Sequence, residues 1–317
     1  MNLIFLKVPS LSVNSPSRPK PFWRSLWQFS RPHTIIGTSL SVWALAFLAN
    51  SPEQLFGLYG WFVLTAWIAC LGGNVFIVGL NQLTDIDIDK INKPHLPVAA
   101  GEFSAKTGWL IVLLSGAIAL LLSIFSGLWL TVTVVSSLAI GTMYSLPPVR
   151  LKRFPLLAAM CIFTVRGVVV NLGLFAHFRD ISSQSVVITP TVWLLTAFII
   201  VFTVAIAIFK DVPDMEGDQQ YRIKTFTLLL GKRKIFNLSL GIIGACYLGM
   251  IAGVWLLATS LNPLVFTIAH MALAIALIYR SQRVNLAQKQ EIAAFYQFIW
   301  KLFFLEYILF IVVNLLP

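Results

Sequence analysis

Long apolar runs separated by short polar links dominate this chain. Nine runs each approach the roughly 20 residues that a helix needs to cross a bilayer. Several of the links are very short, such as Ser126-Gly127, and a link of that length places consecutive helices antiparallel. The pattern predicts an all-α integral membrane fold, with nine transmembrane helices in one bundle at residues 34–50, 59–82, 107–124, 128–145, 156–176, 190–210, 236–257, 262–280 and 297–315.

The chain before the first run has a different character. Its short apolar start is broken by a lysine and a proline, and it lacks the apolar core and the cleavage site of a signal peptide. We predict a mobile or interfacial segment at residues 1–30 and a membrane domain at residues 31–317. The interfacial part is expected at Phe22–Phe29, with Trp23 and Trp27 at the level of the lipid headgroups.

The composition agrees with a membrane protein. Of the 317 residues, 58% are hydrophobic and 11% are charged, which is roughly half the charged fraction of a soluble protein. The net charge of +11 lies in the links, which favours contact with anionic lipid over nucleic acid. Cys70, Cys161 and Cys246 are far apart in apolar runs, so neither a disulfide framework nor a zinc site is indicated.

The basic residues are distributed unevenly between the links. Lys and Arg collect in the N-terminal segment and in the links after the second, fourth, sixth and eighth runs, whereas the links on the other side contain only Arg179. By the positive-inside rule, the N-terminus and the even-numbered links are predicted to face the cytoplasm. The links at 83–106 and 211–235 are each long enough to hold a short extra helix. We expect these segments to cap the bundle and to carry the function.

Seven of the twelve acidic residues occur in two short stretches of these same links, NQLTDIDIDKINKPHLP and KDVPDMEGD. If each preceding helix continues, the polar side chains in each stretch repeat at the spacing of one helical face. Two such faces on the same side of the bundle predict one shared site. The positions are Asn81, Asp85 and Asp89 in the first stretch and Asp211, Asp214 and Asp218 in the second.

Clustered carboxylates need cations to neutralise them. Oxygen ligands without His or Cys at matching spacing favour Mg²⁺, which commonly completes its shell with substrate phosphates. Basic side chains nearby suit an anionic phosphate, and the apolar helical bundle suits a lipid tail. The substrate class indicated is therefore a lipid diphosphate. The basic candidates are Lys93, Arg150, Lys152, Lys210, Arg222 and Lys224.

A divalent-cation transporter is the alternative of a different class. Transporters usually carry their acidic residues near the bilayer midplane on broken helices. Here the acids lie at helix ends beside basic links, which favours a phosphate substrate over a translocated ion.

The two acidic motifs and the sequence segments around them resemble those of a known family. Asn81-x-x-x-Asp85-x-x-x-Asp89 followed by KDVPDMEGD resembles the paired motifs of the UbiA-type intramembrane aromatic prenyltransferases. That family usually has Asp where this chain has Gln82, and NQ is usual in its homogentisate branch. The segments RPHT, NKPHLPVAAGEFS and TMYSLPPVRLKRFP also resemble that branch. Gln82 and the segment LPVAAGEFS argue against chlorophyll synthase and haem O synthase.

The resemblance implies a reaction. The expected activity is Mg²⁺-dependent transfer of phytyl from phytyl diphosphate to homogentisate with loss of CO₂, giving 2-methyl-6-phytyl-benzoquinol for tocopherol biosynthesis in a thylakoid or plasma membrane. Solanesyl and geranylgeranyl diphosphates are alternative donors, because cavity depth sets the chain length; no oligomeric state is implied. The implied metal site comprises Asn81, Asp85, Asp89, Asp211, Asp214 and Asp218, and Tyr144 joins Lys93, Arg150, Lys152 and Lys210 as a diphosphate contact.

Arg166 stands inside the fifth apolar run, in TVRGVVVNLG. An intramembrane Arg should face a cavity or a partner, so we expect it to bind the carboxylate of homogentisate. Arg31, at the mouth of the first helix, is the alternative for that role. Asn171 lies five positions after Arg166 and therefore on another face, where it is expected to bond across helices.

Overall fold

The computed structural model describes residues 21–57, 59–220 and 225–316, except for the side chains of residues 216–218. Within those ranges the chain is helical and contains no strand. Nine described spans are long and apolar enough to cross a membrane, which confirms the predicted fold of a multi-pass membrane protein. They are Pro32–Ala49 (α2), Gly60–Thr84 (α4), Ala105–Ser126 (α6), Leu128–Ser145 (α7), Pro155–Ile181, Pro190–Phe209 (α10), Lys232–Leu256 (α13), Pro263–Ser281 (α14) and Lys289–Leu315 (α15).

The fifth span is not a uniform α-helix. It consists of α8 (Pro155–Phe163), a π-helical turn at Thr164–Val169 (η2) and α9 (Val170–Ile181). π-turns are rare and occur frequently at functional sites. This one contains Arg166.

The predicted helix boundaries differ most where polar sequence flanks an apolar run. Helix α15 begins at Lys289 instead of residue 297, and α9 ends at Ile181 instead of residue 176. Hydropathy marks only the apolar part of a helix, whereas polar side chains extend the helix beyond the hydrocarbon core.

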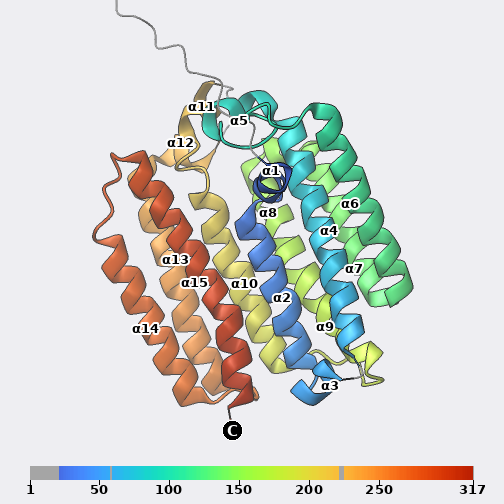
Figure 1. The fold of residues 1–317 in the computed structure, drawn as a ribbon. Coiled ribbons are helices and arrows are strands. Elements are labelled where there is room, and N and C mark those ends of the chain that lie inside the picture. The colour runs from blue at the N-terminus through green and yellow to red at the C-terminus, as the bar shows by residue number, and fades with distance from the viewer. Residues whose placement is uncertain (1–20, 58, 221–224, 317) are drawn as a thin grey trace, which may run out of the picture.

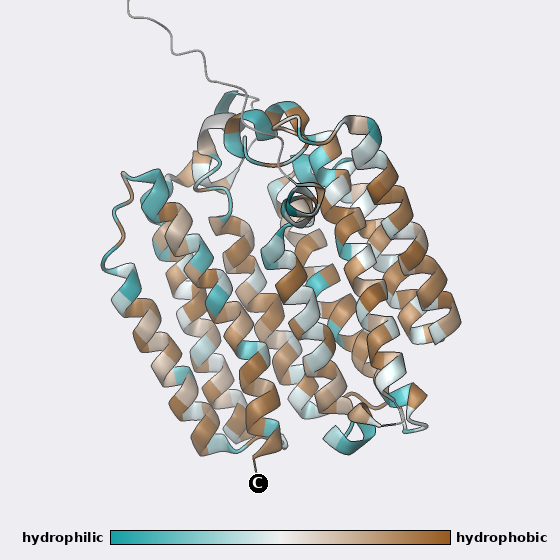
Figure 2. Ribbon diagram, viewed as in Figure 1, coloured by the Kyte–Doolittle hydropathy of each residue, from teal (hydrophilic) through white to brown (hydrophobic). Residues whose placement is uncertain are grey.

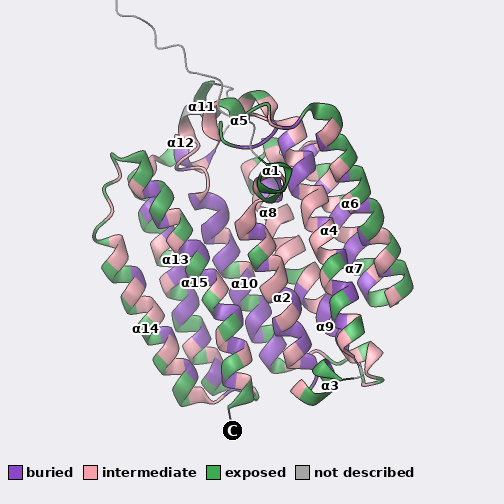
Figure 3. Ribbon diagram, viewed as in Figure 1, coloured by how far each residue is buried: buried purple, intermediate pink, exposed green. Residues whose placement is uncertain are grey.

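Helix α10 lies at the centre of the bundle. Of its 20 residues, 14 are buried, and it contacts α8, η2, α13 and α15. A helix that is apolar on every side is expected in such a position. The outer helices α6 and α14 expose apolar side chains instead, including Leu113 (60% exposed) and Ile275 (64% exposed). Figures 2 and 3 show these apolar, exposed faces along the sides of the bundle, where lipid replaces water.

Four short helices gather at one end of the bundle (Figure 1). This end contains the predicted extra helices of both long links. The short helix α3 (Pro52–Phe56) lies at the opposite end. The four are α1 (Phe22–Phe29), α5 (Ile86–Asn92), α11 (Met215–Gln220) and α12 (Phe226–Leu230).

Helix α1 matches the predicted interfacial segment in its bounds. Trp23 and Trp27 are 75% and 49% exposed, whereas Phe29 is fully buried. The helix therefore has one face for its surroundings and one for the protein, as an interfacial helix requires.

The prediction that each acidic stretch continues the preceding helix is wrong. Helix α4 ends at Thr84, and Asp85 leaves helical geometry with φ −123° and ψ 22° before α5 begins. Helix α10 ends at Phe209, and Pro213, which has no backbone N–H to donate, separates it from α11. The motif residues are therefore brought together by folding of the cap and not by one continuous helix in each stretch, although Asn81 and Asp85 remain hydrogen-bonded through their side chains.

Candidate active site

Lys93 joins the two acidic stretches. It lies at the C-terminal end of α5 and forms an ion pair with Asp214, which immediately precedes α11. Helices α5 and α11 also contact each other. The structure thus brings the two stretches together at the capped end of the bundle.

Asp85 is held by two cations. Its Oδ1 accepts a hydrogen bond from Arg150 Nη2 at 2.9 Å, and its Oδ2 accepts one from Lys152 Nζ at 2.7 Å. Lys152 also donates to Thr84 Oγ1 at 2.9 Å. Burial lowers the pKa of Lys152, although the Asp85 carboxylate acts in the opposite direction. These two basic residues therefore lie close enough to the acidic motif to exchange a carboxylate for a phosphate.

Asn81 connects Asp85 to Arg31. Asn81 Nδ2 donates to Asp85 Oδ2 at 3.2 Å, and Asn81 Oδ1 accepts from Arg31 Nη2 at 3.1 Å. Arg31 and Arg150 both have left-handed backbones, with φ of 52° and 38°. Left-handed geometry is strained for residues other than glycine and is often retained at functional sites.

Asp89 is a buried carboxylate that lacks full compensation. It is 5% exposed, and its Oδ2 has no hydrogen-bond partner among the described residues. Burial raises the pKa of Asp89 to about 6, although Arg31 and Lys93 act against that rise. Burial likewise raises the pKa of Asp211. A buried oxygen without a partner is a suitable ligand for a hard cation.

Lys210 lies on the other side of the same region. Its Nζ donates to Tyr144 Oη at 3.3 Å and lies 3.9 Å from Asp211 Oδ1. Tyr144 comes from the end of α7 and Lys210 from the end of α10, so two distant helices contribute to one polar cluster. All five diphosphate candidates, Lys93, Tyr144, Arg150, Lys152 and Lys210, therefore border the acidic motifs.

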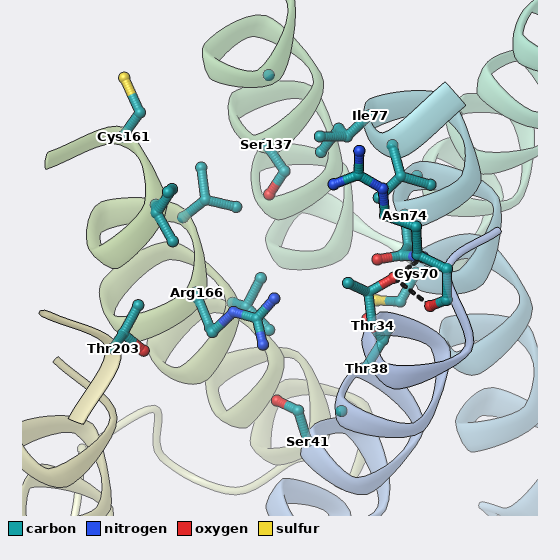
Figure 4. Close-up of a pocket in the computed structure, with 18 of the residues that line it drawn as sticks. Thr34, Thr38, Ser41, Cys70, Asn74, Ile77, Ser137, Cys161, Arg166 and Thr203 are labelled. Atoms are coloured by element: carbon teal, nitrogen blue, oxygen red, sulfur yellow. Dashed lines mark hydrogen bonds between the residues drawn. The ribbon is translucent and has the colours of Figure 1, made fainter. Parts of the chain in front are cut away.

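A cavity of about 290 Å³ extends from this cluster into the bundle. Arg31, Asn81, Tyr144 and Lys210 line its part nearest the cap, and its walls come from α2, α4, α7, η2, α10 and α15. Much of the lining is aliphatic, but one wall carries small polar side chains. Figure 4 shows Thr34, Thr38, Ser41, Asn74 and Ser137 around this space.

Arg166 reaches into the cavity from η2, towards Thr34 and Thr38 (Figure 4). Its guanidinium carbon lies 4.9 Å from the Trp300 ring centre and 5.6 Å from that of Phe303, which are cation–π distances. Among the described residues, no carboxylate pairs with it. An unpaired guanidinium deep in a membrane protein is suited to an anionic ligand.

Asn171 occupies the face that its spacing predicted. It is fully buried, away from the cavity lining, and Ser41 Oγ donates to its Oδ1 at 3.5 Å. Arg166 therefore serves the cavity while Asn171 links α9 to α2.

Gln82 does not point at the acidic site. Its Nε2 donates to the backbone oxygen of Phe29 at 2.6 Å, and the residue is 1% exposed. Asn74, two turns earlier on α4, donates to the Ser30 carbonyl at 3.4 Å. Side-chain amides of α4 thus hold the corner between α1 and α2 from which Arg31 projects. In the sequence, Gln82 served only to indicate the homogentisate branch of the family. This contact was not predicted, because its acceptor is a backbone oxygen.

Other residues of the two acidic links are placed elsewhere or not described. Asp87 is exposed and pairs with Lys90 at 2.9 Å on the outer side of α5. Arg153 is also exposed. The Asp218 side chain, Arg222 and Lys224 lie outside the described residues.

The donors at the site fit Mg²⁺ in kind. They are carboxylate and amide oxygens, and the Asp89 oxygen without a partner is the observation that calls for a cation. However, no three His, Cys, Asp or Glu side chains converge closely among the residues described. Lys93, Arg150 and Lys152 instead neutralise the carboxylates.

Comparison with known proteins identifies the family. The UbiA prenyltransferase family model matches residues 38–302. The chain belongs to this family. It is 56% identical over 304 residues to a homogentisate phytyltransferase of Synechocystis sp., covering 93% of this chain and 96% of that protein. It is 39% identical to the chloroplastic homogentisate phytyltransferase 1 of Arabidopsis thaliana, covering 94% and 78%.

A solved structure of the same family shares the fold. A UbiA homologue from Archaeoglobus fulgidus, bound to GPP and Mg²⁺, matches with a TM-score of 0.64 at 18% identity, covering 91% of this chain and 100% of that one. The chain is thus an intramembrane UbiA-type prenyltransferase in fold and family.

Proposed function

We propose that this enzyme transfers a phytyl group from phytyl diphosphate to homogentisate, in the presence of Mg²⁺ and with loss of CO₂, to give 2-methyl-6-phytyl-benzoquinol for tocopherol biosynthesis. The observation that carries the proposal is the arrangement of charge. Paired acids and bases stand at the mouth of the cavity, and an unpaired arginine stands deeper inside. The first arrangement suits a metal-bound diphosphate, and the second suits an acidic acceptor. The 56% identical relative supports the same reaction.

The diphosphate binds at the capped end. Lys93, Arg150 and Lys152 release their carboxylates and take up phosphate oxygens when the donor enters, while Lys210 and Tyr144 contact it from the other side. Bound Mg²⁺ supplies the positive charge that stabilises the departing diphosphate. Its ligands would come from Asn81, Asp85, Asp89, Asp211, Asp214 and Asp218.

The acceptor binds deeper in the cavity. Arg166 holds the carboxylate of homogentisate, because it faces the cavity without an acidic partner. Arg31 instead donates a hydrogen bond to Asn81 and holds the side chain of that proposed metal ligand in place. The cavity excludes water from the allylic cation, and aromatic rings such as Trp300 stabilise its charge.

The orientation of the protein follows from its charge. The capped end faces the cytoplasmic side of a thylakoid or plasma membrane in a photosynthetic organism, which is consistent with the basic links at that end and with the cyanobacterial and chloroplastic relatives. A solanesyl or geranylgeranyl donor is the alternative within the family. A transporter is disfavoured, because the acids lie at the cap and no Asp or Glu lines the cavity among the described residues.

Turnover of purified protein tests the proposal. Radiolabelled homogentisate is offered with phytyl, geranylgeranyl or solanesyl diphosphate, each with and without Mg²⁺. We expect a lipid-soluble product and ¹⁴CO₂ from carboxyl-labelled substrate, only with Mg²⁺ and fastest with phytyl diphosphate. Folded protein that gives no product with any donor would contradict the proposed reaction. A faster reaction with another donor would show that the enzyme has a different prenyl-donor specificity within the family.

A further inference from the structure

His33 lies in the first turn of α2 and lines the cavity. It is half-buried, and its ring centre is 4.9 Å from that of Trp300, the ring over which Arg166 also stacks. Among the described residues no hydrogen bond engages its ring nitrogens. The imidazole is therefore presented to the space beside Arg166, where the proposed acceptor binds.

The other described histidines have different environments. His177 and His270 are buried elsewhere in the bundle, and His270 is bonded to Glu306 at 2.9 Å. His95 is exposed in the link after α5. Within the described chain, His33 is thus the one histidine placed at the cavity.

The cavity offers few groups that could accept a proton near neutral pH. Its described lining contains no Asp or Glu. Its tyrosine, lysine and cysteine side chains ordinarily lose their protons only above neutral pH. Imidazole is the side chain that ordinarily titrates in the physiological range. The cations near His33 are Arg31 and Lys93 on the cap side and Arg166 across the cavity, and Tyr296 and Tyr307 face the same space from α15.

We propose that His33 is the general base of the prenyl transfer, an inference that rests on the proposed function. The allylic C–O bond breaks and its electron pair leaves with the diphosphate. A π electron pair of the homogentisate ring forms the new C–C bond. The C–H electron pair at that carbon returns to the ring, and the proton passes to an imidazole nitrogen of His33.

The proton has a destination in the same catalytic cycle. Loss of CO₂ leaves an electron pair on the benzylic carbon, which takes up one proton to become the methyl group. Prenyl transfer releases one proton and decarboxylation consumes one, so the two steps together are balanced.

The test is His33→Gln, which keeps hydrogen-bonding capacity but accepts no proton near neutral pH. His95→Gln is the matched control. We expect kcat to fall roughly 100-fold or more in His33→Gln, while KM for both substrates and Mg²⁺-dependent binding of phytyl diphosphate stay within about threefold. The loss should be the same with methylhydroquinone, an acceptor without a carboxylate, because its ring proton must still leave.

A further readout separates a base from a structural residue. Added imidazole should partly restore turnover to His33→Gly. Turnover of His33→Gln within threefold of wild type would overturn the proposal, and so would a loss of turnover explained by lost donor binding. Wild-type protein without homogentisate prenylation would instead refute the proposed function, so the two failures are distinguishable.

Discussion

Replacement of Arg166 separates recognition of the acceptor from recognition of the donor. Arg166→Gln removes the charge that faces the cavity and leaves a shorter, neutral polar side chain. A hydrogen bond to a charged group contributes about 1.5–3 kcal/mol. The expected increase in KM for homogentisate is therefore roughly 10- to 150-fold. Arg166→Lys should give an intermediate value, because Lys keeps the charge but not the planar group that stacks on Trp300.

The assay compares two acceptors. Methylhydroquinone is homogentisate without its carboxylate, so it cannot use Arg166. In the wild type it should be the poorer acceptor, and in Arg166→Gln the two acceptors should have similar KM values. Arg153→Gln serves as the control, because Arg153 is exposed and lies outside the cavity lining.

The comparison forms a cycle in which the shared term is the contact between carboxylate and guanidinium. If Arg166→Gln weakened both acceptors equally, the carboxylate would not be its ligand. If KM for phytyl diphosphate rose instead, Arg166 would belong to the donor site. Either result would refute the assignment while leaving the metal site untouched.

Three further predictions follow from the acidic site and its supports. Asp85→Asn or Asp214→Asn should abolish product formation while near-native thermal unfolding is retained; normal turnover in either variant would remove the argument for a metal site. Gln82→Glu should reduce the free energy of unfolding by about 1–3 kcal/mol, because the new carboxylate faces the Phe29 carbonyl and has no hydrogen to donate to it. The variant should not bind Mg²⁺ more tightly than wild type in a titration; tighter binding would make position 82 a metal ligand. Burial raises the pKa of Asp89 to about 6 in the folded protein, so folding of the metal-free protein takes up a proton at this residue. The free energy of unfolding without metal should therefore fall as the pH rises from about 4 to 6. In thermal melts at several pH values, Asp89→Asn should flatten that dependence.

Hydropathy was sufficient to find the nine spans, because a membrane helix needs a long apolar run whatever its neighbours are. Spacing alone also predicted that Arg166 and Asn171 lie on different faces, since both lie in one continuous span. These features depend on local sequence and on the solvent that surrounds the helix.

The geometry of the cap depends on tertiary contacts and was therefore not predictable. Asp85 leaves the helix where Arg150 and Lys152 hold it, and those residues are more than 60 positions later in the chain. Gln82 bonds to a backbone oxygen 53 positions earlier, which no residue type can signal. The sequence places His33 at the start of a helix, but the cavity beside it is formed by distant helices and is visible only in the folded chain.

The most direct test of the account measures Mg²⁺-dependent donor binding. A nonreactive thiolo analogue of phytyl diphosphate is titrated calorimetrically into detergent-solubilised wild type, Asp214→Asn and Asp87→Asn. Asp87 is the matched control, because it lies on the outer side of α5. The account predicts tight binding only with Mg²⁺, lost in Asp214→Asn and retained in Asp87→Asn. Equal binding without Mg²⁺, or unchanged binding in Asp214→Asn, would contradict the claim that the two acidic stretches form one metal–diphosphate site.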